Sequence, residues 1–74
     1  MKLINCKMSS NIRSFGYNEK RKILRIVFSS GSVYDYYNVQ KQLFDLFEWV
    51  DKTKLSVGSF FIGHIKNKHK FLKH

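Results

Sequence analysis

The chain has 74 residues, of which 43% are hydrophobic and 16% aromatic, and its formal net charge is +9. This length allows a single domain, residues 1–74, with little room for a deep catalytic cleft, and the many aromatic rings exclude a disordered chain. The single cysteine, Cys6, cannot form an internal disulfide, which favours a reducing compartment. No apolar run is long enough for a signal peptide or a membrane span, so we expect a cytoplasmic protein that does not contact membranes.

Three segments in the first half of the chain have the composition or the alternation of β-strands. The first covers about residues 9–17, and the residues before it can extend it. The second covers residues 22–28 and the third residues 32–37. A charged turn at 18–21 and the sequence Ser29-Ser30-Gly31 separate them. Because these connections are short, we expect an antiparallel meander.

From residue 39 the apolar residues recur with the period of a helix instead of a strand. They form one stripe, which consists of Val39, Leu43, Leu46, Phe47 and Val50. This stripe predicts a helix over residues 40–52, with Asn38 as a candidate N-cap. Acidic residues lie opposite the stripe, where we expect solvent: Asp45, Glu48 and Asp51. The stripe is flanked on its two sides by Phe44 and Trp49.

A second, shorter helix is expected to follow the first. Ser56 or Ser59 can cap it. It can pack onto the first helix through Phe61, Ile62 and Ile65. The tail, residues 66–74, is basic and contains two apolar residues, Phe71 and Leu72, that can dock it. The predicted fold class is therefore α+β: a three-stranded antiparallel meander followed by two helices packed on one face of the sheet.

The sequence lacks the residue sets that catalysis and metal binding require. No Cys/His signature surrounds Cys6 to supply a base, and the acids cluster on one solvated helix face. His64, His69 and His74 are five residues apart, so neighbours do not share a helix face as a zinc-binding i, i+4 pair does. The four glycines form no phosphate-binding motif. We therefore expect a protein that is not an enzyme and that uses no cofactor or metal.

The placement of two tyrosines depends on how the second and third strands pair. Tyr34 and Tyr36 are two residues apart and point to one face of a strand. A three-residue loop ending in a left-handed Gly31 would put them on the most apolar face, whereas a two-residue loop would put them beside Arg25. Hairpin preferences favour the first register, with packed tyrosines and with Arg25 and Asp35 as neighbours on the other face. An open face would instead make the tyrosines a stacking platform for unpaired bases.

Several short motifs follow one another along the chain. They are Ser9-Ser10-Asn11-Ile12, Gly16-Tyr17, Leu24-Arg25-Ile26-Val27-Phe28, Gly31, Tyr34-Asp35-Tyr36 with Val39, Ser56-Val57-Gly58-Ser59-Phe60-Phe61 and Ile65-Lys66-Asn67-Lys68. As a set they resemble the KTSC domain, a short module found at the C-terminus of some lysyl-tRNA synthetases and as a free-standing small protein in bacteria and phages. The central Tyr-x-Tyr is the hallmark of that family, and the resemblance covers about residues 8–70.

Four positions depart from the pattern of that family. Gln40 stands where the family usually has Pro, Ile62 where it tends to have Asn, and His69-Lys70 where it tends to have Tyr-Pro. Pro at the first helical position only favours helix initiation, so we expect the fold to survive. If the Asn contributes to binding, this chain has lost that contribution. For function, the resemblance implies RNA binding, through the association of the module with tRNA synthetases.

The positive charge is concentrated in two segments of the chain. Residues 1–34 hold seven basic residues against one acid and residues 52–74 hold six with no acid, whereas residues 35–51 hold one against four. Such a directional field suits an anionic partner. We therefore predict a small, non-enzymatic basic module that binds RNA or another single-stranded nucleic acid. The predicted contacts are Arg13, Lys20, Arg21, Lys22, Arg25, Tyr34, Tyr36, Tyr37, Lys66, Lys68 and Lys70.

The alternative is a protein-interaction module, such as a phage-encoded inhibitor of a host or defence protein. A basic domain can dock to an acidic protein surface, and Phe44 and Trp49 on the helix flanks offer apolar contacts. The same aromatic residues, together with an unpaired edge of the small sheet, also permit self-association. Both a monomer and a homodimer are compatible with the sequence.

Overall fold

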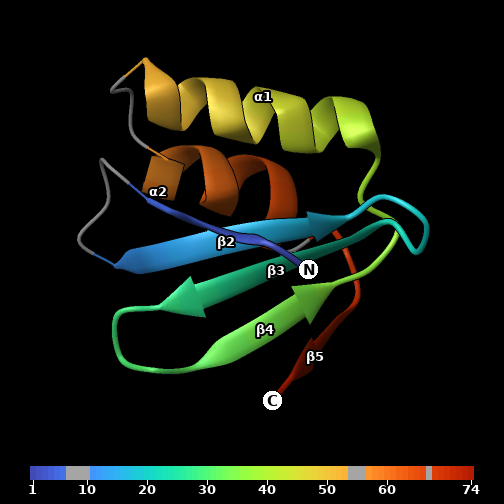
Figure 1. Cartoon of the computed structure of the whole chain (residues 1–74), viewed down its shortest axis with the longest axis horizontal. Coiled ribbons are helices and arrows are strands. Elements are labelled where there is room, and N and C mark those ends of the chain that lie inside the picture. Colours follow the sequence, from blue (N-terminus) through green and yellow to red (C-terminus); the bar gives the residue numbers. More distant parts are fainter. Residues whose placement is uncertain (7–10, 54–56, 67) are drawn as a thin grey trace.

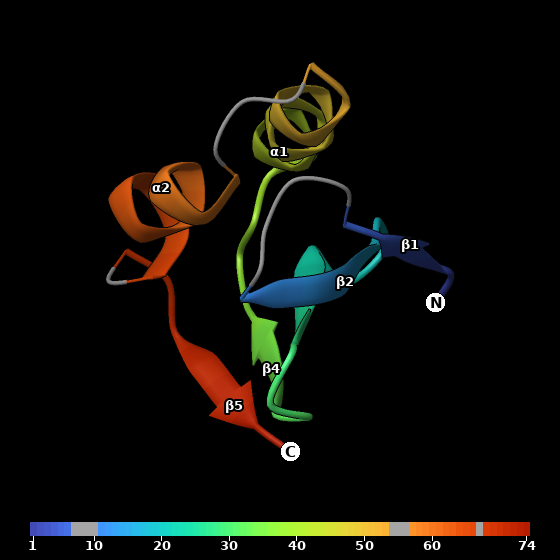
Figure 2. The same ribbon diagram turned by 90° about the vertical axis from the view of Figure 1, so that its left-hand side faces the viewer.

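The computed structural model describes residues 1–6, 11–53, 57–66 and 68–74. These residues form β1 (Leu3–Asn5), β2 (Ile12–Asn18), β3 (Ile23–Phe28), β4 (Val33–Tyr36), α1 (Lys41–Lys52), α2 (Val57–Phe61), η1 (Ile62–Lys66) and β5 (Phe71–Lys73). The η1 segment is a turn of π-helix that continues α2. The strands form one antiparallel sheet in the order β1-β2-β3-β4-β5. Both helices lie on the same side of this sheet (Figures 1 and 2).

The predicted α+β class and the two helices are confirmed, but the prediction of three strands is wrong. The residues before the first predicted strand form a separate strand, β1, in which Leu3 pairs with Gly16. A Cβ at Gly16 would lie 2.7 Å from the carbonyl oxygen of Lys2, so the glycine lets β1 approach. The basic tail docks as a fifth strand, with Phe71 paired to Tyr36. β1 and β5 have three residues each, which is too few for an alternating sequence pattern to predict a strand.

The predicted register of the central hairpin is confirmed. Gly31 has φ 96° and donates its backbone N–H to the carbonyl of Phe28 at 2.9 Å. The loop is therefore the three-residue type, and it pairs Ile26 with Tyr34 and Leu24 with Tyr36. Directly opposed residues share a face. Both tyrosines consequently lie on the side of the sheet that the helices cover.

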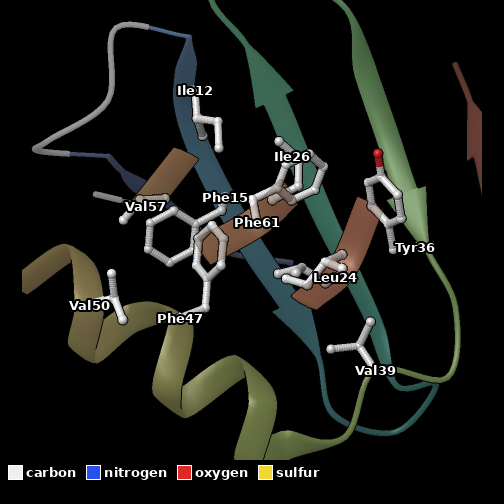
Figure 3. Packing of buried hydrophobic residues seen from close by; sticks show 11 residues of the cluster. Ile12, Phe15, Leu24, Ile26, Tyr36, Val39, Phe47, Val50, Val57 and Phe61 are labelled. Carbon is white, nitrogen blue, oxygen red and sulfur yellow. The ribbon is translucent and has the colours of Figure 1, made fainter. Parts of the chain in front are cut away.

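The core lies between the sheet and the two helices. It consists of Ile12, Phe15, Leu24, Ile26, Tyr36, Val39, Phe47, Val50, Val57, Phe61 and Ile65. Phe15 of β2 and Phe47 of α1 meet edge to face near its centre, with ring centroids 4.8 Å apart (Figure 3). The hydrophobic stripe of α1 is thus used as predicted at Phe47 and Val50.

Other details of the helix prediction are wrong. The N-cap of α1 is Gln40, in an extended conformation and without a side-chain cap, instead of Asn38. Asn38 has φ 57°, a left-handed turn that redirects the chain, and the next residue, Val39, donates its N–H to the carbonyl of Lys22. Ser59 lies inside α2 and does not cap it. The alternative cap, Ser56, and residues 9 and 10 of the first predicted strand lie outside the described residues.

Three side chains differ from the prediction in their exposure to solvent. Leu46 and Ile62 were expected to pack, but they are 45% and 61% exposed. Asp51 was expected in solvent, but it is 2% exposed and accepts a hydrogen bond from the Cys6 thiol at 3.3 Å. The sheet and α2 therefore cover a face of α1 rotated from the one that the apolar spacing predicts. None of the helices in the described ranges is long and apolar enough to span a bilayer.

Candidate functional site

A cleft of about 610 Å³ opens between one end of the sheet and the second helix. Its walls come from the start of β2, the β3–β4 hairpin, β5 and the α2–η1 segment. The lining residues are Asn11, Ile12, Phe28, Ser29, Ser30, Ser32, Tyr34, Tyr36, Gly58, Phe61, Ile62, Lys66 and Phe71. The cleft therefore contains both tyrosines of the Tyr-x-Tyr sequence.

Three rings form an aromatic wall of this cleft: Tyr34, Tyr36 and Phe71. The two tyrosines are close to parallel, with centroids 6.2 Å apart and an interplanar angle of 18°. Phe71 of β5 lies 5.4 Å from the Tyr34 ring and 5.7 Å from the Tyr36 ring. Behind them, Phe61 of α2 holds Tyr36 edge to face at 5.3 Å. Phe71 is 54% exposed, so the wall faces solvent at β5 and is fixed from behind by the core.

Within the part of the chain that the structure describes, the fold does not use the tyrosine hydroxyls of the cleft. Neither Tyr34 nor Tyr36 makes a hydrogen bond through its hydroxyl to any described residue, whereas the Tyr17 hydroxyl donates to the Val39 carbonyl at 2.6 Å. Burial, and to a smaller extent Tyr34, raises the pKa of Tyr36. Its hydroxyl therefore keeps its proton at neutral pH and can donate to a ligand.

Cationic and hydroxyl groups surround the aromatic wall. Lys66, the last residue of η1, lines the cleft. The Lys73 ammonium lies 5.9 Å from the centre of the Tyr34 ring, within the range of a cation–π contact. The serines of the β3–β4 turn form the rim on the other side. The cleft thus combines flat apolar surfaces with positive charge at its border, which suits a planar group that carries an anion.

A buried carboxylate on the opposite face holds the strand that closes the cleft. Asp35, 6% exposed, accepts two hydrogen bonds from Arg25 at 2.7 and 2.9 Å, and its Oδ2 lies 2.8 Å from Nε2 of His74. These contacts join β3, β4 and the end of β5. The hydrogen bonds from Arg25 first, and then the contact with His74, lower the pKa of Asp35 despite its burial. Asp35 therefore stays ionised at neutral pH and ties β5 to the sheet.

The structure brings together some of the predicted nucleic-acid contacts and separates others. Tyr34, Tyr36 and Lys66 meet at the cleft. Arg25 lies on the other face and is occupied by Asp35, so its assignment to the same binding surface is not supported by its position. Arg13 is exposed where the β2–β3 register shifts, and it does not line the cleft.

The remaining predicted contacts gather at the opposite end of the sheet. We call this surface the basic end and define it as Lys20, Arg21, Lys22, Lys68 and Lys70. All five side chains are exposed. They come from the β2–β3 turn and from the segment that leads into β5, which lie at the same end of the sheet (Figure 1). Tyr37 is half-buried there, and its N–H donates to the carbonyl of Lys70 at 2.9 Å.

Sequence reasoning missed Phe71 and Lys73 as site residues. The signal that could have found them is their spacing, because side chains two residues apart in a strand point to the same face of the sheet. Lys73 pairs with Tyr34 and Phe71 pairs with Tyr36, so the face that they share forms the wall of the cleft. Within the described part of the chain, no three His, Cys, Asp or Glu side chains gather closely enough to hold a metal ion.

Comparison with known proteins identifies the family. The family model described as the KTSC domain matches residues 8–71. The chain belongs to the KTSC domain family. Its structure is similar to the crystal structure of a KTSC domain protein from Yersinia pestis, with a TM-score of 0.86 and 30% sequence identity over 99% of this chain and 96% of that chain. A comparison with curated proteins found none that matches the sequence. The Tyr-x-Tyr sequence of this KTSC domain, Tyr34 and Tyr36, lines the cleft.

Proposed function

We propose that this KTSC domain is a non-enzymatic module that binds single-stranded RNA and holds an unpaired base in the cleft. The observation that supports this most strongly is the aromatic wall of Tyr34, Tyr36 and Phe71, which lines the cleft, is exposed at Phe71 and is bordered by lysines. A base stacked on an aromatic side chain contributes about 1–3 kcal/mol. Lys66 and Lys73 lie where they can contact the adjoining phosphates.

The charge of the molecule supports an anionic polymer as the ligand. The net charge is +9, and one of the few acids, Asp35, is neutralised by Arg25 on the far face of the sheet. A base in a duplex presents only its edge, whereas an unpaired base can stack on an aromatic side chain, so a cleft lined by aromatic residues favours an unpaired base. The resemblance to a module attached to some lysyl-tRNA synthetases is in keeping with RNA as the polymer.

The test is a titration of a fluorescently labelled oligouridine, followed by anisotropy at two salt concentrations. The wild-type protein is expected to bind at low salt and to bind more weakly at high salt. Tyr34→Ala should weaken binding by about 10-fold or more, which corresponds to about 1.4 kcal/mol of lost stacking. Trp49→Ala is the matched control, because Trp49 is an exposed aromatic residue of α1 that does not line the cleft.

Two results would contradict the proposal. One is the absence of binding by the wild-type protein even at low salt. The other is a Tyr34→Ala protein that keeps its fold and binds the oligonucleotide as tightly as the wild type does. A loss of binding in Trp49→Ala would place the ligand on α1 instead of in the cleft.

A second candidate function, the protein-interaction module, is favoured by one observation. Leu46 and Trp49 are three residues apart on α1 and are 45% and 54% exposed, so they form a small apolar surface outside the core. A phage-encoded inhibitor of a host or defence protein is an example of this class. Affinity capture after nuclease treatment tests it: a stoichiometric partner should be lost with Trp49→Ala and kept with Tyr34→Ala. The reverse pattern would exclude α1 as the contact.

A further inference from the structure

A second, shallow depression lies beside the cleft at Phe71. Phe71 lines both of them, and the depression is otherwise lined by Lys68, His69 and Lys70. A ligand that leaves the cleft past Phe71 therefore meets two lysines at once. Tyr34, which lines the cleft, and Tyr37, which lies at the basic end, are three residues apart, or roughly 10 Å along a strand.

Backbone hydrogen bonds attach Lys22 and Lys70 to the segment that links β4 to α1. The N–H of Val39 donates to the carbonyl of Lys22, and the N–H of Tyr37 donates to the carbonyl of Lys70, both at 2.9 Å. Nδ1 of His69 lies 3.0 Å from the Tyr37 carbonyl. The segment between β4 and α1 thus joins the β2–β3 turn on one side to the segment before β5 on the other.

The cations of the basic end are not neutralised by the protein. None of the five forms an ion pair with an acid in the described part of the chain. The ion pairs there belong instead to Arg25, Lys41, Lys52 and His74. The acid nearest in sequence is Glu19. Asp45, whose carboxylate also acts on Tyr17 beside this end, is paired with Lys41 at 3.0 Å. The surface therefore has a net positive charge that is available to a bound anion.

We infer that the cleft and the basic end form one continuous track for a single strand of several linked nucleotides. One base occupies the cleft, the strand passes Phe71, and Lys20, Lys22, Lys68 and Lys70 contact the phosphates that follow. This inference rests on the proposed function and adds to it a second contact surface, the basic end, so that several linked nucleotides bind in preference to a free nucleotide. A mononucleotide fills the cleft alone and leaves the basic end without a ligand.

The experiment compares two ligands and three variants of the full chain. The ligands are a short labelled oligouridine and uridine monophosphate. Lys20→Gln/Lys22→Gln and Lys68→Gln/Lys70→Gln each remove two charges from the basic end. The control, Lys2→Gln/Lys52→Gln, removes two charges from exposed positions outside both parts of the track.

We expect the oligonucleotide to bind more tightly than the mononucleotide. On a single strand each phosphate contact contributes a slope of about 0.7 to the plot of log K against log salt. Each basic-end variant should therefore flatten that slope by about 1.4 and bind the oligonucleotide more weakly, with an unchanged affinity for the mononucleotide. The control should match the wild type. In the wild-type protein, backbone NMR signals of residues 20–22 should shift with the oligonucleotide and not with the mononucleotide, a measurement that needs no variant.

The outcomes separate the two proposals. Unchanged salt slopes in both basic-end variants would overturn the continuous track and leave the cleft as the binding site. Equal affinities for mononucleotide and oligonucleotide would do the same. If the wild-type protein binds neither ligand at low salt, the proposed function itself fails, and the track fails with it.

Discussion

The layer between the sheet and the helices has two halves that use aromatic residues differently. In the closed half, Phe15 and Tyr17 of β2 pack against Phe44 and Phe47 of α1. The Phe15 ring meets Phe47 at 4.8 Å, and Tyr17 stacks on Phe44 at 4.7 Å with an interplanar angle of 9°. The Tyr17 hydroxyl is bonded to a carbonyl. In this half every ring has a packing partner and the hydroxyl has an acceptor.

In the open half, the rings are Tyr34, Tyr36, Phe61 and Phe71. They also contact one another, at centroid distances from 5.3 to 6.2 Å, but they line a cleft and the tyrosine hydroxyls have no partner in the described ranges. This half is bordered by the short edge strand β5 and by the α2–η1 segment, whereas α1 packs on the other half. Residue type alone therefore does not distinguish a core aromatic residue from one that lines a site. The difference is whether the surrounding elements close over the rings.

The largest expected effect is the loss of the closed half. Phe47→Ala removes a fully buried ring at the centre of the core, and such truncations cost about 3–5 kcal/mol. For a domain of 74 residues this is a large part of the total stability. Urea denaturation followed by circular dichroism should show a transition at much lower denaturant, or no folded protein. A variant as stable as the wild type would mean that the closed half does not hold the fold together.

The next largest effect concerns Asp35, whose carboxylate contacts Arg25 and His74 and so holds β5 in the sheet beside the open half. Asp35→Asn removes the charge that pairs with Arg25, which is partly exposed, so we expect a loss of about 1–2 kcal/mol, with water replacing part of the interaction. The lowered pKa of Asp35 means that its contribution is present above pH 3.8 and is lost as the pH falls through the lowered value.

The measurement is thermal unfolding of both proteins across the acid range. The difference in midpoint between wild type and Asp35→Asn should be greatest at neutral pH and should shrink below pH 3.8. Amide exchange at Leu72 should be faster in the variant at neutral pH, because Asp35 and Leu72 are paired across β4 and β5. A constant difference from neutral to acid pH would show that the ionised carboxylate is not what stabilises this edge.

The smallest expected effects on stability come from removing one tyrosine hydroxyl in each half. This pair of substitutions compares the two halves most directly. Tyr17→Phe should cost about 1 kcal/mol, since it leaves the Val39 carbonyl without its donor. Tyr36→Phe should leave the free energy of unfolding nearly unchanged, because its hydroxyl has no partner in the described residues. Equal losses in the two variants, measured by urea denaturation, would show that the hydroxyl of Tyr36 serves the fold and is not reserved for a ligand.

The central hairpin was predictable because a single residue determines its register. Gly31 adopts the left-handed conformation that a three-residue loop requires, and this places Tyr34 and Tyr36 on the helix side. Along β3, buried and less buried residues alternate over enough residues to be recognised. The family resemblance, drawn from the same residues, is confirmed over nearly the whole chain.

The cleft was not predictable, because its wall depends on a strand that the pattern of the tail does not reveal. Phe71 and Lys73 lie in a three-residue strand whose formation depends on tertiary pairing with β4 and on the contact between His74 and Asp35. The burial of Asp51 was missed for a similar reason. Its partner, Cys6, is 45 residues away in sequence, and no local pattern contains that contact.

The measurement that tests the account most directly is an NMR titration of the labelled wild-type protein with oligouridine. The largest shifts are expected at Ser32, Tyr34 and Phe71, around the cleft, while the signals of Phe15 and Phe47 in the closed half should stay in place. Shifts centred on Leu46 and Trp49 of α1, or no shifts at any ratio of oligonucleotide to protein in low salt, would contradict the account.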